Sequence, residues 1–204
     1  MNKKRLNEGC FLFPQFFGAA AQQLILEEIR AVIAEAPFFT PRMPRTGRPF
    51  SVAMTNCGPL GWVSDKDGGY RYESVHPETG KPWPSLPTPL LDAWARLTGF
   101  AQPPQACLVN YYGRGAKLGL HRDEDEKDFS APIMSVSLGD SAIFRLGGLK
   151  RRDPVESIEL HSGDVLIMGG ESRLRYHGVS RVHAGTSDLL AEGGRINLTL
   201  RYVG

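Results

Sequence analysis

Apolar positions recur at helical spacing in two stretches of the first half of the chain. Residues 18–36 place an apolar stripe opposite Glu and Arg side chains, and Pro37 ends the run. Residues 89–98 carry a second stripe, and Gly99 follows as a candidate C-cap. The stripes consist of Leu24, Ile25, Ile29, Val32 and Ile33, then Leu90, Leu91, Trp94 and Leu97. Both patterns predict helices that buttress a sheet.

Residues 40–88 show no such periodicity and are rich in Pro and Gly. Asp67-Gly68-Gly69 predicts a tight turn, and the aromatic residues Trp62 and Tyr70 bracket it. This pattern predicts a short hairpin or a covering loop.

After residue 104 the pattern changes to short apolar runs separated by Gly, Asp and Pro. Such runs predict many short strands, as in a β-sandwich or jelly roll. The candidate strands are 106–112, 132–138, 141–146, 155–160, 163–168, 173–179 and 195–203. We therefore predict a mainly β, α+β fold. No sharp linker interrupts the chain, so residues 1–104 are expected to form an extension of a core at 105–204, together one domain.

Composition narrows the class of protein. The chain has 204 residues, 41% hydrophobic and 23% charged, which is ordinary for a soluble globular protein. No apolar run approaches the roughly 18 residues of a membrane helix, and no signal peptide is evident. Cys10, Cys57 and Cys107 are scattered without a CxxC pair, which excludes a zinc ribbon and favours the cytoplasm. Nothing demands more than a monomer.

The net charge of +2 neither requires nor excludes a nucleic-acid partner. Arg42, Arg45 and Arg48 lie close together in a proline-rich segment. This segment is either a solvated loop or a patch that contacts phosphates.

One metal-binding pattern stands out. His121 and Asp123 are two residues apart, so on an extended chain they point the same way. His177 lies in a later predicted strand, which a jelly roll can bring alongside. Two imidazoles and one carboxylate suit non-haem Fe(II). The alternatives are a solvated charged run at 121–128 and a hydrogen-bonded core histidine. The other histidines lie in turn-rich segments and are weaker candidates: His76, His161 and His183.

The last predicted strand alternates between apolar and polar residues. Its polar face contains no acid and consists of Arg195, Asn197, Thr199 and Arg201. Arginine binds carboxylates through a planar fork, so this face can hold a dicarboxylate cosubstrate, or it is simply solvated. On an earlier strand, Asn110 and Tyr112 add neutral donors on one face.

With these residues in view, the chain resembles the AlkB family of nucleic-acid dealkylating dioxygenases. The resemblance covers most of the chain. Its blocks are Thr55-Asn56-Cys57-Gly58, Gly61-Trp62, Lys81-Pro82-Trp83-Pro84, Asn110-Tyr111-Tyr112, Gly115-Ala116-Lys117-Leu118, His121-Arg122-Asp123-Glu124-Asp125, the segments 131–139 and 147–151, Gly169-Gly170-Glu171-Ser172-Arg173, Tyr176-His177-Gly178 and 195–201.

The resemblance implies a double-stranded β-helix core with a nucleotide-recognition lid at about 40–88. It implies that Fe(II), 2-oxoglutarate and O2 are used to demethylate 1-methyladenine and 3-methylcytosine in single-stranded or flipped-base DNA, possibly RNA. The implied iron ligands are His121, Asp123 and His177. The implied 2-oxoglutarate ligands are Asn110, Tyr112, Arg195, Asn197 and Arg201. The implied substrate contacts are Trp62, Tyr70, Asp125 and Arg151. Because these lesions are cationic, Asp125 is expected to select them electrostatically, unless it is one more solvated acid of the charged run.

Two features depart from the family pattern. Met168 stands where bacterial relatives carry Trp, and the linker 178–194 is slightly longer. Three other functions compete with dealkylation. They are a 2-oxoglutarate hydroxylase for a protein side chain or small molecule, a nucleic-acid-binding module with a decayed site, and a cupin-type metal isomerase. The aromatic lid disfavours a hydroxylase for another substrate. The complete triad disfavours a decayed site, and the arginine face disfavours a cupin-type isomerase.

Overall fold

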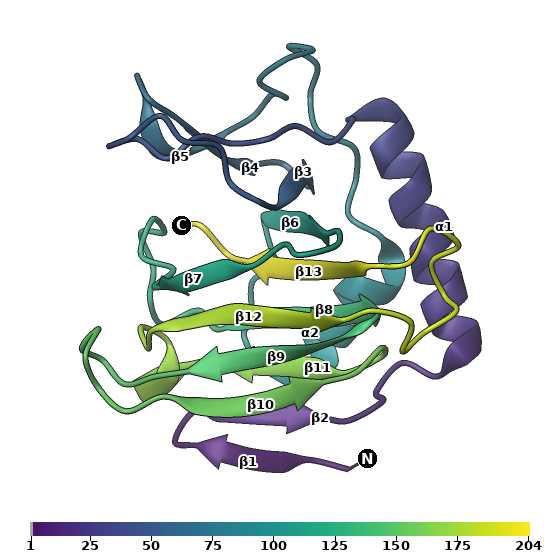
Figure 1. The fold of residues 1–204 in the computed structure, drawn as a ribbon, viewed down its shortest axis with the longest axis vertical. Coiled ribbons are helices and arrows are strands. Elements are labelled where there is room, and N and C mark those ends of the chain that lie inside the picture. Colours follow the sequence, from purple (N-terminus) through teal and green to yellow (C-terminus); the bar gives the residue numbers. More distant parts are fainter. Residues whose placement is uncertain (1) are drawn as a thin grey trace.

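Seven antiparallel strands form the larger of the two sheets that make up the core of the computed structural model, which describes residues 2–204 (Figure 1). Their order across the sheet is β1 (Lys4–Asn7), β2 (Cys10–Phe13), β11 (Val165–Met168), β8 (Ile133–Gly139), β13 (Arg195–Arg201), β6 (Ala106–Tyr112) and β3 (Ala53–Cys57).

A smaller sheet of four antiparallel strands faces the larger one. Its order is β10 (Glu156–Leu160), β9 (Ser141–Leu146), β12 (His177–His183) and β7 (Leu118–His121). Apolar side chains from both sheets fill the space between them, among them Leu108, Phe144, Leu146 and Leu166. This is the predicted jelly roll, closed by strands that are distant in the sequence.

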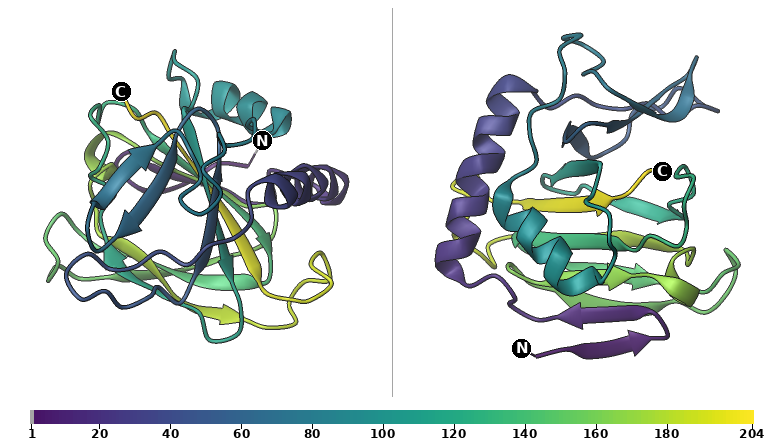
Figure 2. Two further views of the ribbon diagram at one scale, coloured as in Figure 1. Left: turned by 90° about the horizontal axis from the view of Figure 1, so that it is seen from above. Right: turned by 180° about the vertical axis from the view of Figure 1, so that it is seen from behind.

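Two helices cover the outer face of the larger sheet (Figure 2). Helix α1 (Ala19–Glu35) and helix α2 (Thr88–Thr98) share one apolar cluster with the side of β13 that faces away from the smaller sheet. Gly99 ends α2 with a φ of 66°, a conformation that glycine adopts without strain. Both predicted helices are confirmed, and so is their buttressing role.

A separate hairpin lies over one end of the two sheets (Figure 1). Strands β4 (Gly61–Asp65) and β5 (Gly69–Glu73) pair around the predicted turn. Trp62 lies opposite Tyr72, and Ser64 lies opposite Tyr70, so these four side chains share one face of the hairpin. The structure thus confirms the hairpin.

Six of the seven predicted strands after residue 104 are present with small shifts at their ends. The seventh, at 173–179, is wrong in its first half. A 3-10 turn at Gly170–Ser172 precedes it, and β12 begins only at His177. The sequence pattern did not reveal β1, β2, β3 or β7, which are only four or five residues long. Three of these pair within the larger sheet, and the division at residue 104 stays a prediction.

Across residues 2–204, the structure contains no helix with the length and apolar character needed to cross a membrane.

Candidate metal and cosubstrate site

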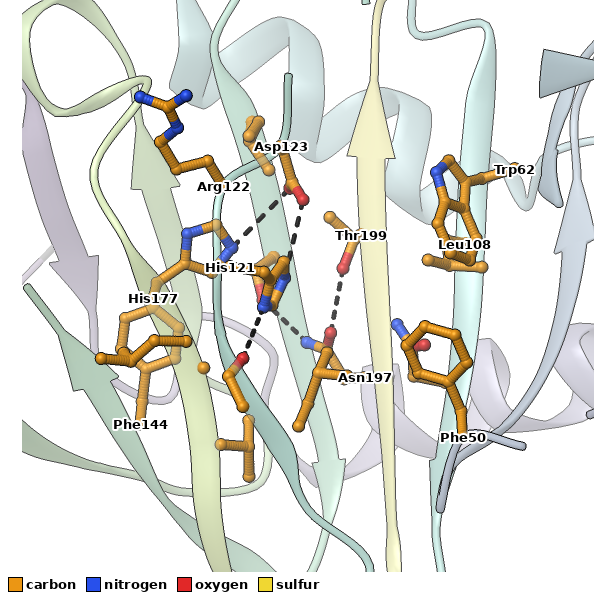
Figure 3. A pocket seen from close by; sticks show the side chains of 18 of the residues that line it. Phe50, Trp62, Leu108, His121, Arg122, Asp123, Phe144, His177, Asn197 and Thr199 are labelled. Carbon is orange, nitrogen blue, oxygen red and sulfur yellow. Dashed lines mark hydrogen bonds and ion pairs between the residues drawn. The ribbon is translucent and has the colours of Figure 1, made fainter. Parts of the chain in front are cut away.

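A cavity of about 640 Å³ opens between the two sheets beneath the hairpin. Side chains from β6, β7, β8, β12 and β13 form its wall, and the hairpin supplies part of its rim. Figure 3 shows that His121, Asp123 and His177 lie together on one side of this cavity, and Asn197 and Thr199 belong to β13 of the larger sheet.

The three predicted metal ligands come together as one cluster. One ligand atom from each of His121, Asp123 and His177 lies within 4.8 Å of the others. His121 ends β7 and pairs directly with His177, which begins β12. Asp123 lies in the loop after β7 rather than in the strand. His121 and Asp123 thus lie together as predicted, although Asp123 is not part of a strand.

Hydrogen bonds orient both imidazoles. The Nδ1 atom of His121 lies 2.9 Å from the carbonyl of Gly119, and that of His177 lies 3.0 Å from the carbonyl of Arg175. A carbonyl only accepts, so Nδ1 carries the proton and Nε2 offers its lone pair to the cluster. Burial lowers the pKa of His177 to about 4, assisted by the neighbouring His121. His177 is thus a neutral ligand at neutral pH.

The Asp123 carboxylate is buried but ionised. Burial alone raises its pKa, yet Arg201 and the two histidines outweigh burial, so the pKa of Asp123 lies well below its ordinary value. Arg201 donates to Asp123 Oδ2 from Nη2 at 2.8 Å and from Nε at 3.2 Å. Two imidazoles and one carboxylate fit an Fe(II) ion.

Arg195 differs from Arg201 because it forms no ion pair with any of residues 2–204. Its side chain is 1% exposed, its Nη2 donates to Ser137 Oγ at 2.7 Å, and its Nε has no partner. Burial lowers the pKa of Arg195 to about 10, so it stays charged at neutral pH. A buried guanidinium with an unused donor fits the carboxylate of a cosubstrate.

The other predicted cosubstrate residues surround Arg195. Register pairs place Tyr112 opposite Arg195 and Asn110 opposite Asn197. Asn110 Oδ1 is buried without a hydrogen-bond partner. Burial raises the pKa of the Tyr112 phenol, which therefore stays a neutral donor. Asn197 Nδ2 donates to Ser135 Oγ at 2.7 Å. The structure thus brings all five predicted residues onto one cavity wall.

Aromatic residues form the rim below the hairpin. Trp62 Nε1 donates to Asp125 Oδ2 at 2.8 Å. The Tyr70 ring stacks on Trp62 with centroids 5.5 Å apart, and Phe50 meets Trp62 edge-on at 6.2 Å. Burial of its carboxyl is the main cause that raises the pKa of Asp125. Trp62 and Asp125, each predicted separately as a substrate contact, thus touch each other on the cavity lining.

Arg151 also lines the cavity. Its Nη1 donates to the carbonyl of Leu120 at 2.7 Å, and its guanidinium lies 5.8 Å from the centre of the Tyr176 ring. Arg122 lies against the same ring at 5.2 Å. Sequence reasoning missed Arg122 and Tyr176 because neither stands out from the runs of polar residues around it.

Several other residues singled out from the sequence lie outside the cavity wall. Arg42, Arg45 and Arg48 are exposed, and Arg42 donates to the carbonyl of Gly47 at 3.0 Å. His76 is buried, and its Nε2 donates to the carbonyl of Pro37 at 2.8 Å, so it is a core histidine. Met168 does line the cavity, whereas Asp140 holds the linker 178–194 through bonds from Thr186, Ser187 and Gly194.

Comparison with known proteins agrees with this geometry. Residues 9–201 match the model of the 2OG-Fe(II) oxygenase superfamily. The chain is 50% identical over 193 residues to the alpha-ketoglutarate-dependent dioxygenase AlkB homolog of Caulobacter vibrioides, covering 95% of this chain and 87% of that protein. It is 46% identical over 203 residues to AlkB of Escherichia coli K12, covering 98% and 92%.

More distant relatives agree as well. The solved structure of OsALKBH1 superposes with a TM-score of 0.80 at 33% identity, covering 98% of this chain and 99% of that one. The chain is also 44% identical over 102 residues to the nucleic acid dioxygenase ALKBH1 of Mus musculus. That alignment covers 50% of this chain and 26% of the mouse protein. On this evidence, the chain belongs to the AlkB family of Fe(II)- and 2-oxoglutarate-dependent dioxygenases.

Proposed function

We propose that this chain removes alkyl groups oxidatively from the bases of nucleic acid, with 1-methyladenine and 3-methylcytosine as substrates. His121, Asp123 and His177 hold Fe(II). Arg195 anchors 2-oxoglutarate, and the neighbours that complete the cosubstrate site are Asn110, Tyr112, Asn197 and Arg201. One observation carries the proposal: a charged, unpaired Arg195 and an Fe(II)-type ligand set share one cavity with an aromatic rim.

The bound metal and cosubstrate, together with O2, supply the oxidising power that hydroxylates an N-alkyl carbon and releases succinate and CO2. The protein's own contribution is positioning. The Arg195 fork holds the carboxylate of the cosubstrate, and the neutral Tyr112 phenol adds a hydrogen-bond donor. The Nδ1–carbonyl bonds of His121 and His177 fix the two rings so that Nε2 faces the metal. A hydroxymethyl group on a ring nitrogen then leaves as formaldehyde.

The alkyl groups of these lesions lie on the pairing edge, which a duplex hides. The chain therefore acts on single strands or on a base flipped out of the stack. Trp62 on the rim and His121 on the wall provide faces on which such a base can stack. Tyr70 currently lies on Trp62 and is half exposed, so it is able to move toward the substrate backbone. Arg151 contacts an adjacent phosphate.

Asp125 selects lesions by charge. 1-Methyladenine and 3-methylcytosine are cationic, and the Trp62 indole holds the Asp125 carboxylate at the mouth of the cavity. A carboxylate in a partly desolvated site attracts a cation more strongly than one in water does. Neutral methylated bases lack this attraction and are expected to be poorer substrates.

Incubation of the pure protein with Fe(II), 2-oxoglutarate, ascorbate and a single-stranded oligonucleotide carrying 3-methylcytosine tests this function. We expect the lesion to disappear in the wild type and to persist with Asp123→Ala. Turnover of 2-oxoglutarate without repair of any methylated oligonucleotide would instead favour a hydroxylase for another substrate. We also propose that the protein is monomeric and cytoplasmic. Sedimentation of the purified protein measures its oligomeric state.

A further inference from the structure

Arg173 is enclosed by the loop that follows Asp123, and each of its nitrogens donates a hydrogen bond there. Nη1 donates to the backbone carbonyl of Asp123 at 2.7 Å, Nε to the carbonyl of Ala131 at 2.9 Å, and Nη2 to Glu126 Oε2 at 2.9 Å. The side chain is 2% exposed. Residues 122–132 contain no helix or strand, so this one guanidinium joins both ends of the loop.

Glu126 connects Arg173 to the site. Its other oxygen, Oε1, lies 3.4 Å from Arg201 Nε and accepts a hydrogen bond from the Tyr72 hydroxyl of the hairpin. Arg201 in turn donates to Asp123. Two carboxylates and two guanidiniums are thus buried together with balanced charge, and we call Arg173 and Glu126 the brace of this network.

We propose that the brace positions the Asp123 carboxylate for metal binding, an inference that rests on the function proposed above and extends its site. Arg201 is shared between Asp123 and Glu126. If Arg173 no longer holds Glu126, that carboxylate attracts Arg201 away from Asp123. The Asp123 backbone also loses its donor. Both changes move the Asp123 carboxylate relative to His121 and His177, so Arg173 and Glu126 act as positioning residues.

A purely structural role would make Arg173 important for stability alone. Metal affinity separates the two roles, because partners of a metal ligand typically change affinity by about 10–100-fold when they are replaced. Trp94 provides a matched control. It is buried in α2 on the outer face of the larger sheet and donates to the carbonyl of Gln102 at 2.9 Å, so Trp94→Phe weakens the fold without touching the site.

Titration calorimetry with Mn(II), which needs neither cosubstrate nor turnover, measures this affinity. Arg173→Lys keeps the charge but loses the planar fork, so we expect Mn(II) to bind about tenfold more weakly. Glu126→Gln should weaken binding to a similar degree, and the double variant should lose less than the product of the two factors because both residues act through one network. Trp94→Phe should bind Mn(II) like the wild type, even if its melting temperature falls as much as that of Arg173→Lys.

Wild-type affinity in Arg173→Lys, with no binding in Asp123→Ala, would overturn the brace and leave the proposed function intact. Equal losses in Arg173→Lys and in Trp94→Phe would also overturn it. If the wild type itself takes up no Mn(II), the proposed function fails and the brace fails with it. Should Arg173→Lys not fold, Tyr72→Phe removes a single hydroxyl from Glu126, and unchanged Mn(II) affinity in that variant would overturn the proposal.

Discussion

Replacing Arg195 by methionine should separate the stability of the protein from its affinity for cosubstrate. Arg195 is buried as a charge without a carboxylate partner, and burial lowers its pKa from the ordinary arginine value to about 10. A base whose pKa is lowered on folding destabilises the folded state at every pH below the lowered value. At about 1.4 kcal/mol per pKa unit, this lowering costs about 3.5 kcal/mol.

Methionine removes this cost and fills most of the same volume, but it loses the hydrogen bonds to Ser137 Oγ and to the carbonyl of Asp140, which contribute about 1 kcal/mol each. We therefore expect the cosubstrate-free Arg195→Met protein to be about 1–2 kcal/mol more stable than the wild type. For a chain of this size that gain corresponds to roughly 2–8 °C in melting temperature.

The same substitution should weaken 2-oxoglutarate binding. Hydrogen bonds to charged groups contribute about 1.5–3 kcal/mol, so the affinity should fall by roughly 10–150-fold. Calorimetry on the Mn(II)-loaded protein measures the affinity, and thermal unfolding without 2-oxoglutarate measures the stability. Pyruvate, a 2-oxo acid without the second carboxylate, is the matched ligand and should bind the variant and the wild type equally. A less stable variant with undiminished 2-oxoglutarate affinity would refute the reasoning.

Three further predictions follow from the site and the core. Asp125→Asn should slow repair of 1-methyladenine and 3-methylcytosine more than repair of neutral 1-methylguanine or 3-methylthymine, measured with matched oligonucleotides; equal losses would contradict charge selection. Burial lowers the pKa of His177 from 6.5 in the unfolded chain to about 4 in the folded one. Between these pH values the unfolded chain binds a proton at His177 and the folded chain does not. The unfolding free energy of the metal-free protein should then fall as the pH drops from 6.5 toward 4 and should not fall in this way in His177→Gln. The three cysteines are buried and burial raises the pKa of Cys10 to about 12, so a thiol reagent should label the chain only after unfolding; rapid labelling of the native protein would argue against this core.

Sequence periodicity predicts an element and its buried face where both depend on one local pattern of residues. The alternation from Arg195 to Arg201 placed Ile196, Leu198 and Leu200 in the helix-covered core and the arginines in the cavity, as the structure has them. The stripes around Ile25 and Leu90 predicted α1 and α2 because an amphipathic helix shows its buried face directly in its sequence.

Contacts between distant segments could not be predicted in this way. The pairing of the Arg201 guanidinium with Asp123 depends on how β13 packs beside the loop at 122–132, which the alternation along β13 alone does not specify. Glu126 resembled another solvated acid in a charged run, yet Arg173 and Tyr72 bury it. Short strands such as β7 contain too few residues to show alternation, so their pairing partners define them.

The most direct test of the central claim is a product count on a single-stranded oligonucleotide carrying 3-methylcytosine. Repaired cytosine, formaldehyde and succinate are quantified from the same reaction with Fe(II), 2-oxoglutarate and O2. Oxidative dealkylation predicts that the three products appear in equal amounts and that none appears with Asp123→Ala. Succinate without repaired cytosine, or repaired cytosine without formaldehyde, would contradict the account.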